Sequence, residues 1–169
     1  KNLPQVGKSS TVKISTTKPQ PKRSKLPQLS INRLGKLESV YSALNVGTRD
    51  YIRKTGFKKV AIAVSGGIDS ALVTTIAADA IGAENVIGVA LPSRYSSEGS
   101  ITDAHQLCSQ LNVELWTIPI ESGHAAFEEM LNDAFRGIEP GLSEENTQSR
   151  IRGNLMMSIA NKFNWLVLS

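Results

Sequence analysis

The sequence is poor in cysteine and in aromatic residues, and it contains no long apolar run. Its single cysteine, Cys108, excludes an intrachain disulfide and a Cys-x-x-Cys motif, which fits a reducing compartment. No stretch of about 18 consecutive apolar residues is present, which argues against a membrane-spanning helix. The first residues also lack the charged-then-apolar order of a secretory signal peptide. These absences favour a cytoplasmic protein that does not associate with a membrane.

Acidic residues are absent from residues 1–30, which carry seven Lys or Arg and four of the seven prolines. The other positions hold 12 Lys or Arg against 15 Asp or Glu, so the chain's net charge of +4 comes from residues 1–30. Such a composition cannot bury a core, and we expect a disordered or extended basic, proline-rich linker or tail there. Because no aromatic residue lies among these charges to stack on bases, a solvated linker is favoured over a nucleic-acid-binding arm.

The chain's length and its 40% apolar content suit one globular domain, which we expect at residues 31–169. Within it, apolar runs of strand length alternate with helical periodicity. We expect strands at about 59–64, 86–91, 113–118 and 165–168, and helices at about 30–54, 69–81, 101–111, 127–135 and 143–162. This alternation predicts an α/β fold with a doubly wound parallel sheet, in which ligands bind beyond the carboxyl ends of the strands.

The apolar run at 60–64 ends in the turn Ser65–Ser70, whose sequence is Ser-Gly-Gly-Ile-Asp-Ser. Gly66 and Gly67 can adopt positive φ angles and let an anion approach the backbone closely. The turn brings its N–H groups to a helix N-terminus, where phosphate binds, and the two serine hydroxyls add donors. Asp69 supplies a carboxylate where Mg²⁺ would accompany the phosphates. A glycine-rich β–α turn without a ligand is the alternative interpretation.

The turn lacks the Gly-Lys-Ser/Thr of a Walker A loop and the third glycine of a dinucleotide fingerprint. It instead resembles the pyrophosphate-binding loop of the N-type ATP pyrophosphatases, which have an adenine-nucleotide alpha-hydrolase-like fold. That resemblance implies that ATP is held by Ser65, Gly66, Gly67, Ile68, Asp69 and Ser70.

A second group of polar residues lies on the last predicted helix. Asn146, Arg150 and Asn154 are spaced four residues apart and form one stripe, opposite an apolar stripe. Taken alone, this pattern is also that of a solvated helix face. Arg152 lies near neither stripe, and Gly153 costs about 1 kcal/mol relative to alanine unless a backbone or ligand approaches it closely.

Residues 144–153 are similar to the segment Glu-Glu-Asn-x-Gln-x-Arg-Ile-Arg-Gly of the glutamine-dependent NAD⁺ synthetases. Segments 40–51 and 161–169 also match that family, so the resemblance covers about residues 37–169. The residues that look like the family's second loop are Pro92, Ser93, Arg94, Tyr95, Ser96 and Ser97.

This resemblance implies an enzyme that amidates nicotinic acid adenine dinucleotide to NAD⁺ through an adenylated intermediate. It implies ATP and Mg²⁺ as cofactors, and glutamine or free ammonia as the nitrogen source. Asp69 would bind the metal, Asn146 and Arg150 would bind the acid dinucleotide, and residues 92–97 would form a mobile loop near ATP. The family also suggests a homodimer and, in the full protein, an N-terminal glutaminase domain.

Several parts of the family pattern are missing from the sequence. No glutaminase domain is present, and residues 1–30 stand where its linker would be. The family's Gly-Asn-Lys-Ser-Glu segment, which supplies further ATP contacts and a second carboxylate for Mg²⁺, would begin just past Ser169. We therefore expect a truncated fragment, incomplete at its C-terminus, that does not complete the amidation by itself.

Two other functions remain open at this point. One is a different ATP pyrophosphatase, such as a GMP synthetase-like or tRNA-modifying enzyme, against which the segment 146–153 argues. The other is a non-catalytic nucleotide-binding fragment.

The remaining candidate side chains have simpler interpretations. Cys108 lies on an apolar helical face, which favours a core thiol over a persulfide carrier. His105 and His124 have no partner at metal-ligand spacing and are expected at the surface or in loops. Glu128 and Glu129 are expected on a solvated helix face.

Overall fold

The computed structural model describes residues 12–14, 34–139 and 141–169, and every structural statement below concerns these residues. The chain divides into two compact units, Lys1–Arg33 and Leu34–Ser169. The predicted linker at 1–30 lies outside the described residues except for 12–14, which belong to no helix or strand. The domain boundaries therefore remain a prediction.

The unit Leu34–Ser169 alternates helices and strands as the sequence predicts. The elements in chain order are α1 (Lys36–Thr55), β1 (Val60–Ala63), α2 (Ile68–Ile81), η1 (Ala83–Asn85), β2 (Val86–Ala90), α3 (Glu98–Leu111), β3 (Glu114–Thr117), α4 (Glu121–Leu131), α5 (Leu142–Phe163) and β4 (Leu166–Leu168). Most boundaries lie within three residues of the predicted ones. In the described ranges, no helix combines the length and apolarity needed to cross a bilayer.

Several helix ends differ from the prediction: α1 begins at Lys36 rather than about residue 30, and α4 begins at Glu121 rather than about residue 127. α4 ends at Leu131, and its predicted continuation through Phe135 is a turn. α5 begins at Leu142, so Ser143 is not its N-cap. The N–H of Gly141 donates to the Glu144 carboxylate at 2.6 Å instead, and this bond lowers the pKa of Glu144. A carboxylate in the first turn of a helix is also favoured by the helix dipole.

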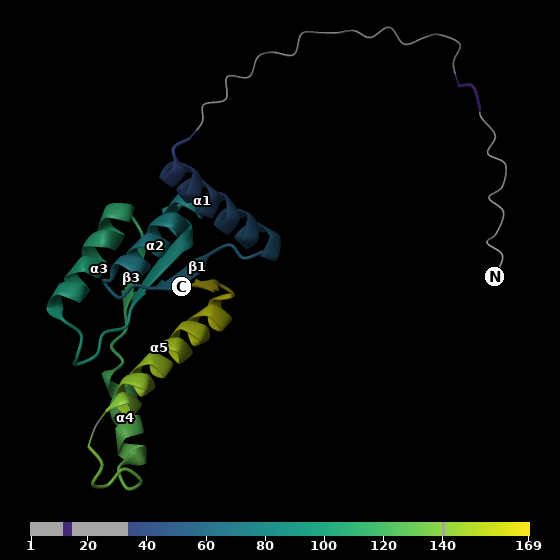
Figure 1. The fold of residues 1–169 in the computed structure, drawn as a ribbon. Coiled ribbons are helices and arrows are strands. Elements are labelled where there is room, and N and C mark those ends of the chain that lie inside the picture. Colours follow the sequence, from purple (N-terminus) through teal and green to yellow (C-terminus); the bar gives the residue numbers. More distant parts are fainter. Residues whose placement is uncertain (1–11, 15–33, 140) are drawn as a thin grey trace, which may run out of the picture. The chain divides into compact units, whose positions relative to one another are not determined.

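The four strands form one parallel sheet in the order β3-β2-β1-β4 (Figure 1). Val60 of β1 is in register with Val86 on one side and with Leu166 on the other. β2 is buried at every position, and β1 at every position except Ala63. Burial on both faces explains why these strands are continuous apolar runs rather than alternating patterns. The prediction of a parallel α/β fold is confirmed.

Helices cover both faces of the sheet (Figure 1). On one face, α2 and α3, with α1 packed on α2, enclose a core of Ile52, Val60, Ile62, Val64, Ala77, Val86, Ala104, Cys108 and Val113. On the other face, α5 covers a core of Ala61, Ile87, Val89, Leu91, Ile120, Ile151 and Met156. The carboxyl ends of β1 and β2 therefore open between two helical layers.

Not every apolar side chain of the helices turns inward. Leu72 of α2 is 50% exposed, whereas Thr74 is fully buried and its hydroxyl donates to the Ser70 carbonyl at 2.7 Å. This bond within the helix satisfies the hydroxyl and makes its burial tolerable. Phe127 and Met130 of α4 are exposed because α4 packs mainly on α5 rather than on the sheet.

Candidate functional site

The turn Ser65–Ser70 lies at the carboxyl end of β1 and leads directly into α2. Gly66 has a φ of +81°, in the left-handed region that favours glycine, whereas Gly67 has a φ of −84°, which any residue can adopt. A Cβ on Gly66 would lie 2.3 Å from the Ser100 carbonyl oxygen and 2.7 Å from the Ser100 Cα. The turn therefore packs against the first residues of α3 so closely that only glycine fits.

Hydrogen bonds between hydroxyl and backbone groups close the turn. The Gly67 N–H donates to Ser65 Oγ at 3.2 Å, and the Ser70 hydroxyl donates to the Gly67 carbonyl at 2.9 Å. The two serine oxygens are 3.2 Å apart. Gly67 is the N-cap of α2 and provides no side-chain cap, so the first N–H groups of the helix are open to an anion.

Asp69 lies in the first turn of α2 and is exposed. It takes no part in the side-chain hydrogen bonds and ion pairs found in the part of the chain that the structure describes. In the same ranges, no group of three or more His, Cys, Asp or Glu could hold a metal ion. A metal at this position would therefore take Asp69 as its protein ligand and complete its shell with other oxygens.

The second predicted loop, residues 92–97, leaves the carboxyl end of β2 beside the turn. It is ordered by its own hydrogen bonds, because the Ser93 N–H donates to Ser96 Oγ at 3.0 Å and the Tyr95 N–H to Ser93 Oγ at 3.3 Å. Ser97 caps α3 by accepting the Ser100 N–H at 3.1 Å. The two loops thus lie side by side, as parallel-sheet topology predicts.

Arg94 connects this loop to α4. Its Nε donates to Glu121 Oε1 at 2.7 Å, and a terminal nitrogen lies 3.1 Å from Glu128 Oε2. The Arg94 hydrogen bond lowers the pKa of Glu121. Glu128 thus keeps much of its side chain exposed on the α4 surface, as expected, and is in addition an ion-pair partner of Arg94. Arg94 does not line the cavity that lies at the carboxyl ends of β1 and β2.

A cavity of about 310 Å³ lies at the carboxyl ends of β1 and β2. This volume falls within the usual range for small-molecule sites. Its walls are apolar residues of β1, β2 and α3, with a polar side formed by Ser65, Ser96, Ser100 and Arg152. The structure thus brings the first residue of the turn and part of the second loop into one cavity.

Other predicted site residues lie outside this cavity. Gly66, Gly67 and Ile68 border a separate open hollow beside α3. Asn146 and Arg150 are exposed on α5, and an Arg150 guanidinium nitrogen donates to the Asn146 carbonyl at 3.0 Å. The two form the predicted stripe, but they line neither hollow.

Arg152 is the cavity residue that sequence reasoning missed. Its Nε donates to the Leu91 carbonyl at 3.0 Å, and a terminal nitrogen donates to Ser93 Oγ at 3.4 Å. The side chain is half-buried, and desolvation lowers the pKa of its guanidinium. Its partners lie 61 and 59 positions earlier in the chain, so spacing within α5 carries no signal for this contact.

Three further side chains test the sequence interpretations. His124 is 1% exposed, so its predicted surface position is wrong; its Nδ1 lies 3.6 Å from Glu128 Oε1. Cys108 is buried in the core, as expected, and burial raises the pKa of its thiol. A Cβ built on Gly153 would meet no described atom within 4 Å outside the backbone of its own helix. No contact with the described residues therefore explains why glycine occupies this position.

Parallel α/β domains with a Ser-Gly-Gly turn after the first strand form the class of the N-type ATP pyrophosphatases, and the described unit has this fold. The family model described as NAD synthase matches residues 40–169, and the chain belongs to this family.

Individual relatives agree with this assignment. The glutamine-dependent NAD(+) synthetase of Thermotoga maritima is 51% identical over 132 residues, which are 78% of this chain and 23% of the relative. The glutamine-dependent NAD(+) synthetase of Rhodobacter capsulatus is 50% identical over 135 residues, which are 80% of this chain and 24% of the relative. The solved structure of the Acinetobacter baumannii glutamine-dependent NAD+ synthetase in complex with ADP superimposes with a TM-score of 0.81 at 41% identity, covering 83% of this chain and 27% of the other. The chain thus spans about a quarter of the length of the curated relatives it matches.

Proposed function

We propose that the protein takes part in the ATP-dependent amidation of nicotinic acid adenine dinucleotide to NAD⁺. The observation that carries this proposal is the cavity of about 310 Å³ in a chain of the NAD synthase family, bordered by both the Ser-Gly-Gly turn and the second loop. The ADP complex of the Acinetobacter baumannii relative supports a nucleotide site in this fold.

The turn Ser65–Ser70 would hold the pyrophosphate part of ATP. Its open N–H groups at the start of α2 and its two hydroxyls are donors for phosphate oxygens. The substrate carboxylate attacks the α-phosphorus, the bond to the β-phosphate oxygen breaks, and pyrophosphate leaves with the negative charge that the turn stabilises. Ammonia then attacks the acyl carbon of the adenylate, AMP leaves, and the ammonia nitrogen loses its extra protons to form the carboxamide.

The residues present fit Mg²⁺. Asp69 is exposed at the start of α2 and free to act as a ligand within the described part of the chain. One or two carboxylates together with substrate phosphates are the usual donor set for this ion. When bound, Mg²⁺ would neutralise charge on the leaving pyrophosphate. Asp69 would hold it beside the turn.

The acid dinucleotide would lie against α5. Arg150 provides a planar fork of donors suited to a carboxylate or a pyrophosphate, and Asn146 lies one turn earlier on the same exposed face. Residues 92–97 would border ATP. Ammonia would come from glutamine, through a glutaminase domain in the full protein, or from solution, and the protein would act as a cytoplasmic homodimer.

The test is product stoichiometry in the full-length protein. With ATP, Mg²⁺, acid dinucleotide and ammonium, the proposal predicts NAD⁺, AMP and pyrophosphate in equal amounts, and none of the three when the acid is omitted. ADP and phosphate as products would contradict the proposal. Nucleotide binding without pyrophosphate release would instead support a non-catalytic role.

A further inference from the structure

A cation without a carboxylate partner lies on the wall of the cavity. Arg152 projects from α5, and none of the ion pairs within 34–139 and 141–169 includes it. Arg94, by contrast, is held by two carboxylates. A half-buried charge is tolerated when hydrogen bonds and an opposite charge compensate its lost hydration. Arg152 has the hydrogen bonds but lacks the anion.

The existing hydrogen bonds of Arg152 use only part of its capacity. A guanidinium carries five N–H donors, and two of them go to the Leu91 carbonyl and the Ser93 hydroxyl. The other three donate to no residue that the structure describes. The two bonds fix the plane of the group against the end of β2, so the remaining donors are preorganised at the cavity wall.

The other residues that line the cavity indicate which anion would fit. Apolar side chains of Val64, Val89 and Ala104 suit a heteroaromatic base, whereas Ser65, Ser96 and Arg152 form a polar side. A nucleotide whose base fills the apolar part would place its first phosphate nearest to the polar part. Because the turn that starts at Ser65 would hold the terminal phosphates, the first phosphate would lie between the turn and Arg152.

We propose that Arg152 binds the α-phosphate of the adenine nucleotide and thereby contacts the phosphoryl group that is transferred in adenylation. This inference rests on the proposal that the cavity binds ATP. Arg152 would then hold the α-phosphate while the substrate carboxylate attacks it, and would hold AMP as it leaves. Leu91 and Ser93 would orient the guanidinium for this contact.

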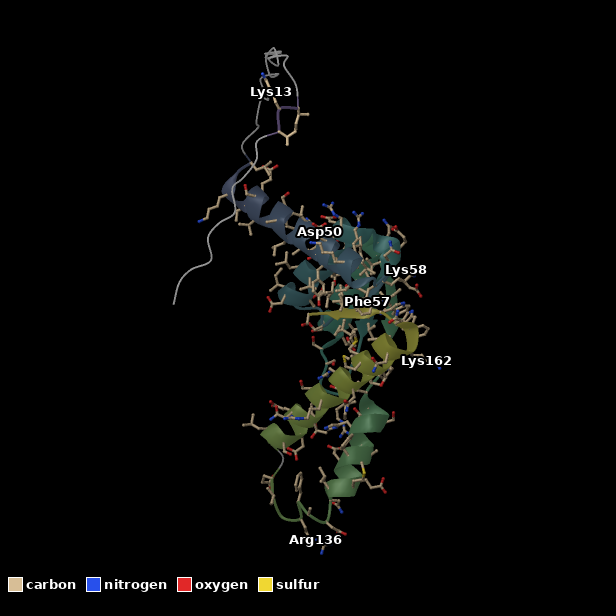
Figure 2. The ribbon with its side chains drawn as sticks, turned by 90° about the vertical axis from the view of Figure 1, so that its right-hand side faces the viewer. Lys13, Asp50, Phe57, Lys58, Arg136 and Lys162 are labelled. Carbon is tan, nitrogen blue, oxygen red and sulfur yellow. The ribbon has the colours of Figure 1, made fainter. Side chains whose placement is uncertain are left out.

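The test compares AMP with adenosine, which lacks the phosphate, by calorimetric titration of this chain. Three variants are used: Arg152→Gln removes the charge and keeps an amide donor, Arg152→Lys keeps the charge and loses the fork, and Arg136→Ala is the control. Among the residues that the structure describes, Arg136 pairs with Asp133 alone, and it lies on the loop between α4 and α5, away from the sheet (Figure 2). Arg136→Ala therefore removes one positive charge at a distance.

For Arg152→Gln we expect AMP affinity to fall about 10- to 150-fold, the usual loss for one charge-assisted hydrogen bond, while adenosine affinity stays unchanged. Arg152→Lys should lose less, because a point charge still attracts phosphate. Arg136→Ala should match wild type. An equal loss of affinity for AMP and for adenosine in Arg152→Gln would show that Arg152 only stabilises the local structure. That result would overturn the inference.

Two further results overturn it as well: a wild-type chain that binds AMP no more tightly than adenosine, and unchanged AMP affinity in Arg152→Gln. Melting temperatures of both Arg152 variants show whether folding is intact, and Arg152→Lys carries the test if Arg152→Gln unfolds. The outcome is separate from that of the proposed function. Loss of AMP preference in a protein that forms no NAD⁺ would support this inference and refute the amidation.

Discussion

Replacing Gly66 by alanine is expected to lower the free energy of unfolding by about 1–5 kcal/mol. The φ of +81° costs an L-residue about 1–2 kcal/mol. The new Cβ would also lie 2.3 Å from the Ser100 carbonyl oxygen, and overpacking of this kind costs about 1–3 kcal/mol. A less flexible unfolded chain offsets about 0.4–1 kcal/mol of this loss. The N-terminus of α3 and the turn Ser65–Ser70 would have to move apart.

Urea denaturation measures this effect directly. With a slope of about 1–3 kcal/mol/M, a loss of 2 kcal/mol lowers the midpoint by about 1 M. The matched control is Gly153→Ala, whose Cβ meets no described atom and lies inside α5. That variant should gain about 0.5–1 kcal/mol, because alanine is the better helix former. A Gly66→Ala midpoint equal to or above that of wild type would refute the close packing of the turn on α3.

Three other substitutions test separate parts of the account. In the full-length protein, Asp69→Asn should greatly weaken Mg-ATP-dependent pyrophosphate release, while the free energy of unfolding from urea denaturation stays within about 0.5 kcal/mol of wild type, since Asp69 is exposed. Near wild-type turnover would refute the metal role. Arg150→Ala should raise KM for the acid dinucleotide much more than KM for ATP, by about 10- to 150-fold, and saturation curves for both substrates decide this. The hydrogen bond from the Gly141 N–H is the main reason why the pKa of Glu144 lies below the usual value of 4.5. The ionised Glu144 carboxylate therefore stabilises the fold fully above about pH 4.5, and this stabilisation is lost as the pH falls through the lowered pKa. Urea midpoints measured from about pH 6 to pH 3 should therefore fall less steeply in Glu144→Gln than in wild type, and parallel curves would contradict the assignment.

The strands and the turn were predictable because their signals are local. A continuous apolar run followed by Ser-Gly-Gly describes β1 and its turn without reference to any other part of the chain. The failures depend on distant partners. Arg152 bonds to a carbonyl 61 positions away, which no spacing within α5 reveals. His124 is buried where α4 packs on α5, and the close approach of Gly66 to Ser100 joins residues 34 positions apart.

If the substrate carboxylate attacks the α-phosphorus of ATP, as proposed, one carboxylate oxygen is transferred to AMP, and this transfer can be measured. The full-length protein would be given acid dinucleotide labelled with ¹⁸O in its carboxylate, together with ATP, Mg²⁺ and ammonium, and the products would be analysed by mass spectrometry. The account predicts one ¹⁸O atom in each AMP molecule formed and none in pyrophosphate. Label in pyrophosphate or inorganic phosphate, or unlabelled AMP alongside NAD⁺, would contradict it.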